Sequence, residues 1–280
     1  MRIRHTAARV GFTAAALVAT SACGAEGART AADAVNNADT IMAALARATD
    51  RTEEVGSAEV RMTTELGTGD PIAMDGTYSW GDGFAFDVEM DTAAARMQQL
   101  TDSPTIRTLF VDGAYYYDVD PQPAGPLQGK EWMRIDGSAV FGEQGADALS
   151  GSAGGSPSAS MRGLRYASDV EDLGEETVGG KSTTHYRAVI DQDGMGRFKE
   201  ALGNRDSLLN SMTGGADSMT MEVWVGAGDL PVRMTQTYGA MKVTMDFDTF
   251  GAAEEIQAPP AARTGDLTDQ VKKAKKAAGR

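Results

Sequence analysis

Apolar and polar side chains alternate along the chain on both sides of a short loop at residues 81–83. A three-residue hairpin loop with glycine in the left-handed position is a favoured geometry, and it pairs Trp80 with Phe84 and Tyr78 with Phe86. A two-residue loop would shift the register by one position and divide the apolar side chains between two faces. The pattern therefore predicts two antiparallel strands sharing one apolar face, formed by Met74, Gly76, Tyr78, Trp80, Phe84, Phe86, Val88 and Met90.

The segment before this hairpin continues the same face. Its residues alternate with Glu59, Arg61, Thr63 and Glu65, and a glycine-containing turn at residues 67–71 leads into the hairpin. Alternation bounded by turn residues is typical of a half-buried strand. We therefore expect a third strand, which adds Val60, Met62, Thr64 and Leu66 to the apolar face.

A second meander is predicted near the C-terminus. A four-residue turn at 226–229 pairs Val223 with Val232 and Met221 with Met234. A two-residue turn at 239–240 then pairs these strands with the next one, in which Met245 and Phe247 face the same way. Turn chemistry and alternation agree, which indicates a meander with one apolar face. The expected cross-strand rows are Val223–Val232–Phe247 and Met221–Met234–Met245.

The middle of the chain gives weaker signals. Turns at 112–113 and 179–180 predict two further hairpins, and the first is apolar on both faces near its turn, so its inward side stays open. Residues 31–51 and 197–212 have apolar residues at helical spacing. A short strand is expected at 131–135, and the Gly, Ser and Ala residues of 146–160 predict a mobile loop. These elements predict an α+β fold built mainly from antiparallel strands.

The N-terminus carries an export signal followed by a cysteine. Three arginines precede an apolar run at residues 10–20, which is too short for a bilayer-spanning helix of about 20 residues. Small residues then precede Cys23, as at the cleavage site of a signal peptide. This arrangement resembles the bacterial lipobox, in which the thiol receives a diacylglycerol, although Thr20 stands where leucine is commonest. Cys23 is therefore the predicted lipid-attachment site; an ordinary secretory signal with an incidental cysteine is the alternative.

Composition narrows the possible partners. The 280 residues include 40 Asp and Glu against 26 Lys and Arg, which gives a formal net charge of −14. Nucleic-acid binding depends on neutralising phosphates with basic residues, so this balance argues against it. Cys23 is the only cysteine in the sequence, so no intramolecular disulfide is possible, and lipidation would use its thiol.

Three segments carry strand-and-turn motifs of one family. Residues 170–188 read VEDLGEETVGGKSTTHYRA, residues 221–233 read MEVWVGAGDLPVR, and residues 247–260 contain a Phe-x-x-Phe-Gly motif followed by Ala-Pro-Pro. These motifs resemble the actinobacterial LppX/LprA/LprF/LprG-type lipoproteins. The resemblance implies a strongly curved antiparallel sheet, a half-barrel with helices packed on its concave face, as in the periplasmic lipoprotein carrier LolA.

The resemblance also implies a function. Studied members of the family hold acylated lipid or glycolipid between sheet and helices and help to move it through the envelope, without catalysis. The predicted apolar face suits such a ligand, because methionine side chains are flexible and repack around variable apolar groups. The expected ligand-binding residues are Met62, Met74, Tyr78, Trp80, Phe84, Phe86, Val88, Met90, Met221, Val223, Val232, Met234, Met245 and Phe247.

The same residues could instead pack against the chain's own helices. The alternative function is therefore an anchored interaction, sensor or scaffold module with a filled core and no lipid ligand. His185 lies in an alternating strand and is expected at the surface, and the sequence has no nucleophile elbow, P-loop or dinucleotide motif. Residues 191–194 begin like a calcium loop, but Met195 and Gly196 supply no further side-chain ligands. We expect no catalysis, no cofactor and no metal.

The predicted organisation has four parts. A signal peptide spans 1–22, a lipidated tether 23–30, a single lipid-binding domain 31–258 and a flexible basic tail 259–280. The expected location is the outer face of the cytoplasmic membrane, where the protein is held by its lipid anchor. The lysines of the tail could touch anionic lipid or remain solvated.

Overall fold

The structure is a computed structural model that describes residues 23–150, 156–202, 215–251 and 254–277. It divides into two compact units, residues 1–37 and 38–280. In the first unit the described residues are helical and belong to α1 (Cys23–Val55). The second unit holds the sheet and, among the described residues, the helices α2 (Gly137–Ser150), α4 (Pro157–Arg162), α5 (Gln192–Leu202) and α7 (Thr268–Ala277).

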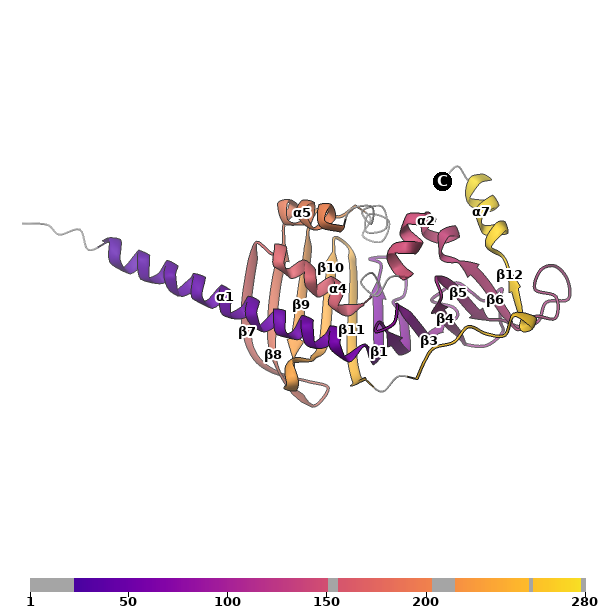
Figure 1. Cartoon of the computed structure of the whole chain (residues 1–280), viewed down its shortest axis with the longest axis horizontal. Coiled ribbons are helices and arrows are strands. Elements are labelled where there is room, and N and C mark those ends of the chain that lie inside the picture. Colours follow the sequence, from indigo (N-terminus) through magenta and orange to yellow (C-terminus); the bar gives the residue numbers. More distant parts are fainter. Residues whose placement is uncertain (1–22, 151–155, 203–214, 252–253, 278–280) are drawn as a thin grey trace, which may run out of the picture. The chain divides into compact units, whose positions relative to one another are not determined.

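Twelve strands of the second unit form one sheet in the order β12-β6-β5-β4-β3-β2-β1-β11-β10-β9-β8-β7 (Figure 1). The end strands β12 and β7 are not paired with each other, so the sheet is curved but unclosed. Every pairing is antiparallel except that of β12 with β6. The strands are β1 (Ser57–Glu65), β2 (Ile72–Ser79), β3 (Ala85–Asp91), β4 (Thr105–Val111), β5 (Ala114–Asp118), β6 (Trp132–Asp136), β7 (Asp169–Val178), β8 (Lys181–Ile190), β9 (Met219–Val225), β10 (Pro231–Tyr238), β11 (Met241–Phe250) and β12 (Thr264–Asp266).

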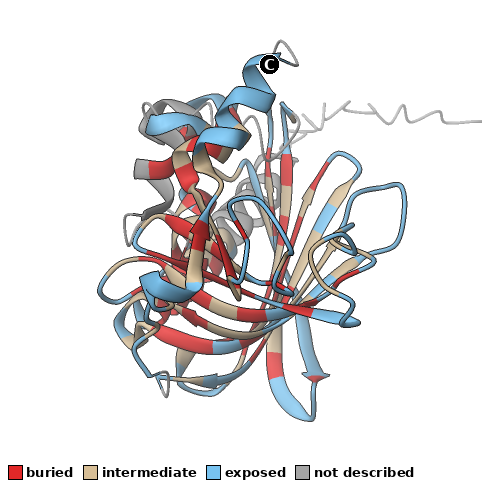
Figure 2. Ribbon diagram, turned by 90° about the vertical axis from the view of Figure 1, so that its right-hand side faces the viewer, coloured by how far each residue is buried: buried red, intermediate tan, exposed pale blue. Residues whose placement is uncertain are grey.

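The two faces of the sheet differ as the alternation predicts. Buried and exposed positions alternate along many of the strands (Figure 2). The outward face carries ion pairs between neighbouring strands, such as Arg61–Asp75 at 2.8 Å and Arg233–Asp246 at 2.6 Å. The inward face packs against the helices in one large apolar cluster. The predicted α+β half-barrel with helices on its concave face is therefore confirmed.

The first meander has the predicted register. Tyr78 pairs with Phe86, Met74 with both Met90 and Met62, and the strands end on either side of the three-residue loop. Leu66, expected on the shared face, lies beyond the end of β1 and is 53% exposed, because the inward alternation stops with the strand.

The predicted register between β9 and β10 of the second meander is wrong. Met234 pairs with Val223 instead of Met221, a difference of two positions. One position arises at the turn, where Val225 pairs with Pro231 instead of the Leu230 that a four-residue turn would give. The other arises at a bulge of β10 between Pro231 and Arg233. The extra residue at a bulge shifts all following pairs by one position. Val232 sits in this bulge and is not among the residues of the large apolar cluster. The pairing of Met234 with Met245 across the 239–240 turn is confirmed.

The segment 146–160 was also predicted wrongly, because its described residues are largely helical. Residues up to Ser150 belong to α2, and α4 begins after Ser156, whose hydroxyl accepts a hydrogen bond from the Ala159 amide. Proline at the first helical position and a serine cap both favour a helix start. Met161 then fixes α4 to the core, where it is 1% exposed. Residues 151–155 lie outside the described residues, as do residues 203–212 of the predicted 197–212 helix.

The 112–113 hairpin is apolar on both faces because both are covered. Phe110 and Tyr115 pair with each other and face the large cluster. On the outward side, Val111 and Tyr116 form a second cluster against which Ile256 packs. Ile256 lies far along the chain, so the hairpin pattern alone could not reveal this cover.

The four predicted parts of the chain stay predictions, but the structure describes two of them further. Residues 23–30, assigned to a tether, are helical, and residues 264–266, assigned to the tail, pair with β6 as β12. The following α7 is tied to α2, since Lys272 lies 3.5 Å from Glu143. None of the described helices is long and apolar enough to cross a membrane.

Trp80 joins α1 to the first hairpin. Its indole N–H donates to the carbonyl of Thr52 in the last turn of α1, at 2.9 Å, and the ring is 1% exposed. Carbonyls in the last turn lack helical partners, so this bond satisfies one of them. Gly56, with φ of 71°, then ends the helix, and its carbonyl accepts the Trp80 amide.

Gly76 should tolerate no side chain. A Cβ there would lie 2.2 Å from the carbonyl oxygen of Asp87, and its φ of 154° is open mainly to glycine. We expect Gly76→Ala to lower the free energy of unfolding by roughly 2–4 kcal/mol in a urea titration. The control is Gly196→Ala in α5, where the added Cβ meets nothing within 4 Å and should stabilise by up to about 1 kcal/mol. Equal effects of the two substitutions would contradict this account.

Candidate functional site

A row of methionines runs across the concave face. The registers place five of them on neighbouring strands, from β3 through β2, β1 and β11 to β10. The row continues into β4 at one end and into β9 and β8 at the other. In strand order its residues are Ile106, Met90, Met74, Met62, Met245, Met234, Val223 and Tyr186.

Burial divides the predicted ligand-binding residues into two groups. Met221 and Met234 are 0% exposed and belong to the same cluster as Leu45 of α1 and Met161 of α4. This buried group also contains nine further predicted residues: Tyr78, Trp80, Phe84, Phe86, Val88, Met90, Val223, Met245 and Phe247. Met62 and Met74 are only partly buried. A ligand could reach the second group without moving a helix, whereas the first group is packed by the chain itself.

The sequence analysis missed the inward aromatic residues of β4, β5 and α2. Phe110 stacks on Phe86 with ring centroids 5.8 Å apart, and Tyr115 lies edge-on to Phe110 at 4.8 Å. Tyr115 also stacks on Tyr117 at 6.2 Å and approaches Phe141 at 6.3 Å. Alternation could not find them, because both faces of this hairpin are apolar.

We call Met62, Met74, Met97, Tyr115, Tyr117 and Phe141 the partly buried apolar surface. All six are partly buried and pack against the large cluster. Such a surface can bind an apolar chain, which gains about 0.8 kcal/mol for each CH₂ removed from water. It offers no charged side chain for catalysis.

Several buried hydroxyl groups lie within these apolar surroundings. The hydroxyls of Tyr78 and Thr108 are buried without a hydrogen-bond partner in the described structure. Burial raises the pKa of Tyr117 to about 12 and also raises the pKa of Tyr78 and of Tyr115. These phenols are therefore neutral at physiological pH and serve neither as bases nor as nucleophiles.

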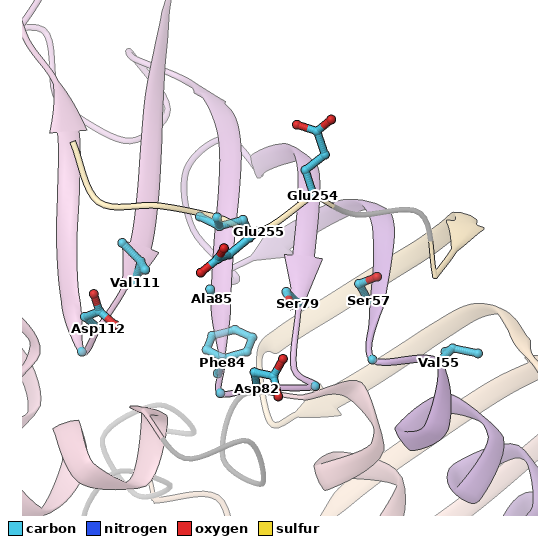
Figure 3. A pocket seen from close by; sticks show the side chains of 15 residues that line it. Val55, Ser57, Ser79, Asp82, Phe84, Ala85, Val111, Asp112, Glu254 and Glu255 are labelled. Atoms are coloured by element: carbon cyan, nitrogen blue, oxygen red, sulfur yellow. The ribbon is translucent and has the colours of Figure 1, made fainter. Parts of the chain in front are cut away.

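A polar pocket of about 520 Å³ lies at the ends of the first two hairpins (Figure 3). Among the predicted ligand-binding residues it is lined by Phe84 alone. Its wall includes Asp82, Asp112, Glu254 and Glu255, and the Glu255 side chain points toward Ala85 while that of Glu254 points away. Four carboxylates suit neither an acyl chain nor an anionic head group.

A smaller pocket of about 170 Å³ lies between α1 and the segment formed by α4 and the 3₁₀ turn Gly163–Tyr166. Its lining includes the core residues Leu45, Met161 and Leu164. Arg162 also lines it and is held 3.2 Å from Glu53 of α1.

His185 lies on the outward face and is less exposed than the sequence suggested, with 13% of its side chain accessible. Its ring stacks on Trp224 at 4.0 Å, and its Nδ1 lies 3.3 Å from Glu176. The Trp224 indole donates to the same carboxylate at 2.7 Å. Among the described residues, no His, Cys, Asp and Glu side chains gather as a metal site.

Cys23 is the first described residue and begins α1. The small residues that precede it, and the rest of the predicted signal peptide, lie outside the described residues. Its assignment as the lipid-attachment site stays a prediction from the sequence.

Comparison with known proteins finds sequence relatives in Streptomyces. The chain is 26% identical over 254 residues to an uncharacterized 31.2 kDa protein of Streptomyces griseus, covering 82% of this chain and 80% of that protein. It is 25% identical over 238 residues to a Streptomyces coelicolor protein named "putative lipoprotein", covering 81% and 75% of the two chains. No protein-family model matches the chain.

Solved structures reveal the same fold. The lipoprotein LppX of Mycobacterium tuberculosis aligns with a TM-score of 0.52 at 14% identity, covering 78% of this chain and 99% of LppX. LprF of Mycobacterium bovis aligns with a TM-score of 0.49 at 13% identity, covering 80% and 98%. The likeness to LppX confirms the fold expected from the motifs of residues 170–260.

Removing the Tyr78 hydroxyl should not lower the stability of the ligand-free protein. Because that hydroxyl has no partner, we expect Tyr78→Phe to leave the free energy of unfolding unchanged or to raise it by up to about 1 kcal/mol. The control is Tyr238→Phe, which removes a 2.6 Å bond to Gln236 and should cost about 1 kcal/mol. Urea denaturation of both variants measures the difference, and a larger loss for Tyr78→Phe would show that its hydroxyl has a partner in solution.

Proposed function

Starting from the LppX-type fold of the chain, we propose that it is an exported lipoprotein that binds acylated lipid or glycolipid on its concave face and carries it through the cell envelope. The observation that carries this proposal is the partly buried apolar surface, which shares Met62 and Met74 with the methionine row. Apolar side chains that the chain's own packing does not cover completely can mark a binding site.

The energetics favour a flexible, chain-like ligand. Burial of about a dozen methylenes yields on the order of 10 kcal/mol, from which ordering and association costs are subtracted. Met62 and Met74 can change rotamers at low cost, so the surface adapts to chains of different length. The buried methionines under α1 and α4 would become accessible only if these helices moved.

Binding rather than catalysis fits the chemistry of this face. The titratable groups here are phenols whose pKa is raised by burial, so they remain protonated. In the part of the chain that the structure describes, the polar pocket of about 520 Å³ is lined by carboxylates and two serines, but by no histidine and no cysteine.

The N-terminal lipoprotein signal supports a location of the protein in the cell envelope. Residues 1–24 have the order of a lipoprotein signal, and the Streptomyces coelicolor relative bears a lipoprotein name. We assign the protein to the outer face of the cytoplasmic membrane, held by acyl chains on Cys23. Two acyl chains suffice for stable anchoring, whereas one is marginal.

The alternative is an anchored interaction module without a lipid ligand. The packing of Leu45, Met161 and Phe198 against the strands favours it, because these helix residues fill part of the concave face. The two functions differ in whether the partly buried apolar surface holds lipid.

Lipidation is tested at Cys23. We expect Cys23→Ala to abolish labelling by radioactive palmitate in an actinobacterial host and to prevent conversion to the processed, lipidated form. The control is Thr20→Leu, which supplies the commonest residue at that position and should keep or increase labelling. Unchanged labelling of Cys23→Ala would place the acyl group elsewhere.

Lipid binding is tested on the inward pair Met62 and Met74. We expect the double variant Met62→Glu with Met74→Glu to carry at least tenfold less co-purified lipid than the wild type. An acyl chain packed against a carboxylate would remove water from the charge, which is costly. Mass spectrometry of the lipid extracted from the purified protein provides the measurement.

The control is the neighbouring outward pair, Thr63 and Ala73, substituted in the same way. Circular dichroism shows whether both variants fold. If the wild-type protein stays empty after incubation with envelope lipids, the carrier is excluded and the interaction module is favoured.

A further inference from the structure

Four hydroxyl-bearing side chains lie on the inward side of β2, β4 and β5. Thr108 pairs with Tyr117, and Phe110, two residues along β4, pairs with Tyr115. Tyr78 joins the same group across β3, because Phe86 pairs with both Tyr78 and Phe110. We call Tyr78, Thr108, Tyr115 and Tyr117 the hydroxyl cluster.

The hydroxyls of two members lack any partner. Tyr78 is 3% exposed and Thr108 is 1% exposed, and neither hydroxyl makes a hydrogen bond within the described structure. Buried polar groups in proteins are normally hydrogen-bonded, so an orphaned pair on one face calls for a missing partner.

The cluster is neutral, and its members interact. The Tyr115 hydroxyl adds to the rise in the pKa of Tyr78, and the Tyr117 hydroxyl adds to that of Tyr115. The inward residues of β4, β5 and β6 include no charged side chain: Ile106, Thr108, Phe110, Tyr115, Tyr117, Met133 and Ile135. Because it contains no cationic side chain, this site is unsuited to binding a phosphate or a carboxylate. Neutral O–H donors in apolar surroundings suit an uncharged acceptor instead.

We propose that the hydroxyl cluster is the polar subsite of the lipid-binding face and that it donates hydrogen bonds to the ester carbonyl of an acylated ligand. This inference rests on the proposed function and adds two things to it: the residues that recognise the ester, and the direction in which the ligand lies. The ester lies at β2–β5, and the acyl chain follows the methionine row from Met74 and Met62 toward β11.

The partly buried apolar surface and the hydroxyl cluster share two residues. Tyr115 and Tyr117 belong to both, and their stacked rings are 6.2 Å apart. A ligand that contacts these rings therefore also contacts part of the cluster. An ether oxygen is a poorer acceptor than a carbonyl oxygen, so the cluster should distinguish ester from ether lipids.

The test is a competition between two glycerolipids of equal chain length and the same head group, one a diester and the other a diether. The full chain, purified in detergent and depleted of lipid, is incubated with an equimolar mixture and released from micelles for native mass spectrometry. We expect the wild type to hold about ten diester molecules for each diether, a ratio that corresponds to about 1.4 kcal/mol.

The double variant Tyr78→Phe with Thr108→Val removes both orphaned hydroxyls and keeps their shape. Its ratio should fall to about one. The matched control is Tyr238→Phe with Thr235→Val, two buried residues of β10, which should keep the tenfold preference.

The outcomes separate this inference from the function on which it rests. Equal binding of both lipids by the wild type, or a preference that survives in Tyr78→Phe with Thr108→Val, overturns the polar subsite and leaves the lipid carrier intact. Binding of neither lipid overturns the lipid carrier itself.

Discussion

The pairing of β1 with β11 is the constraint on which the rest of the structure depends. These strands come from opposite ends of the described chain and join two local meanders into one sheet. Their register places Met62 beside Met245 and Val60 beside Phe247, so the inward rows continue from one meander to the other. A slip of one residue would turn Asp246 toward the methionines, because adjacent side chains in a strand face opposite sides. The continuous apolar face is therefore a consequence of one long-range pairing.

Local hairpins could be predicted from the sequence because each combines a defined turn with two-residue alternation. The pairing of Tyr78 with Phe86 followed from a three-residue loop that keeps the apolar side chains on one face, and the structure has this pairing. The predicted β9–β10 register is off by two positions, because the turn between the strands is one residue longer than expected and the bulge at Val232 adds another residue. The inward side of the 112–113 hairpin stayed open for another reason. Its outward cover comes from Ile256, and alternation within a hairpin carries no information about such a distant segment.

The inward-facing residues of the site could be predicted from the sequence, but their burial could not. Alternation identifies which residues face inward, but it cannot show which of them the chain covers with its own helices. Met221 and Met62 have the same pattern in the sequence, yet the first is fully buried and the second is partly exposed. The helix α4 provides part of that cover and lies in a segment whose composition suggests a loop. Its start depends on the cap at Ser156, and its position depends on packing of Met161, so tertiary contacts decide its structure.

A packed concave face and a lipid-binding face are compatible in this fold because the two halves of the sheet are covered differently. Over β8–β10, helix residues such as Met195 and Phe198 fill the core and contribute to the stability of the empty protein. Over β2–β5, aromatic rings pack side by side while two of the buried hydroxyls lack partners. An unsatisfied buried hydroxyl costs about 1–3 kcal/mol, and a phenylalanine or valine would avoid this cost. The empty protein thus carries a local penalty in the part of the sheet that also holds the partly buried rings of Tyr115 and Tyr117. A ligand that supplies an acceptor removes this penalty, so part of its binding free energy comes from polar groups that the fold leaves unpaired.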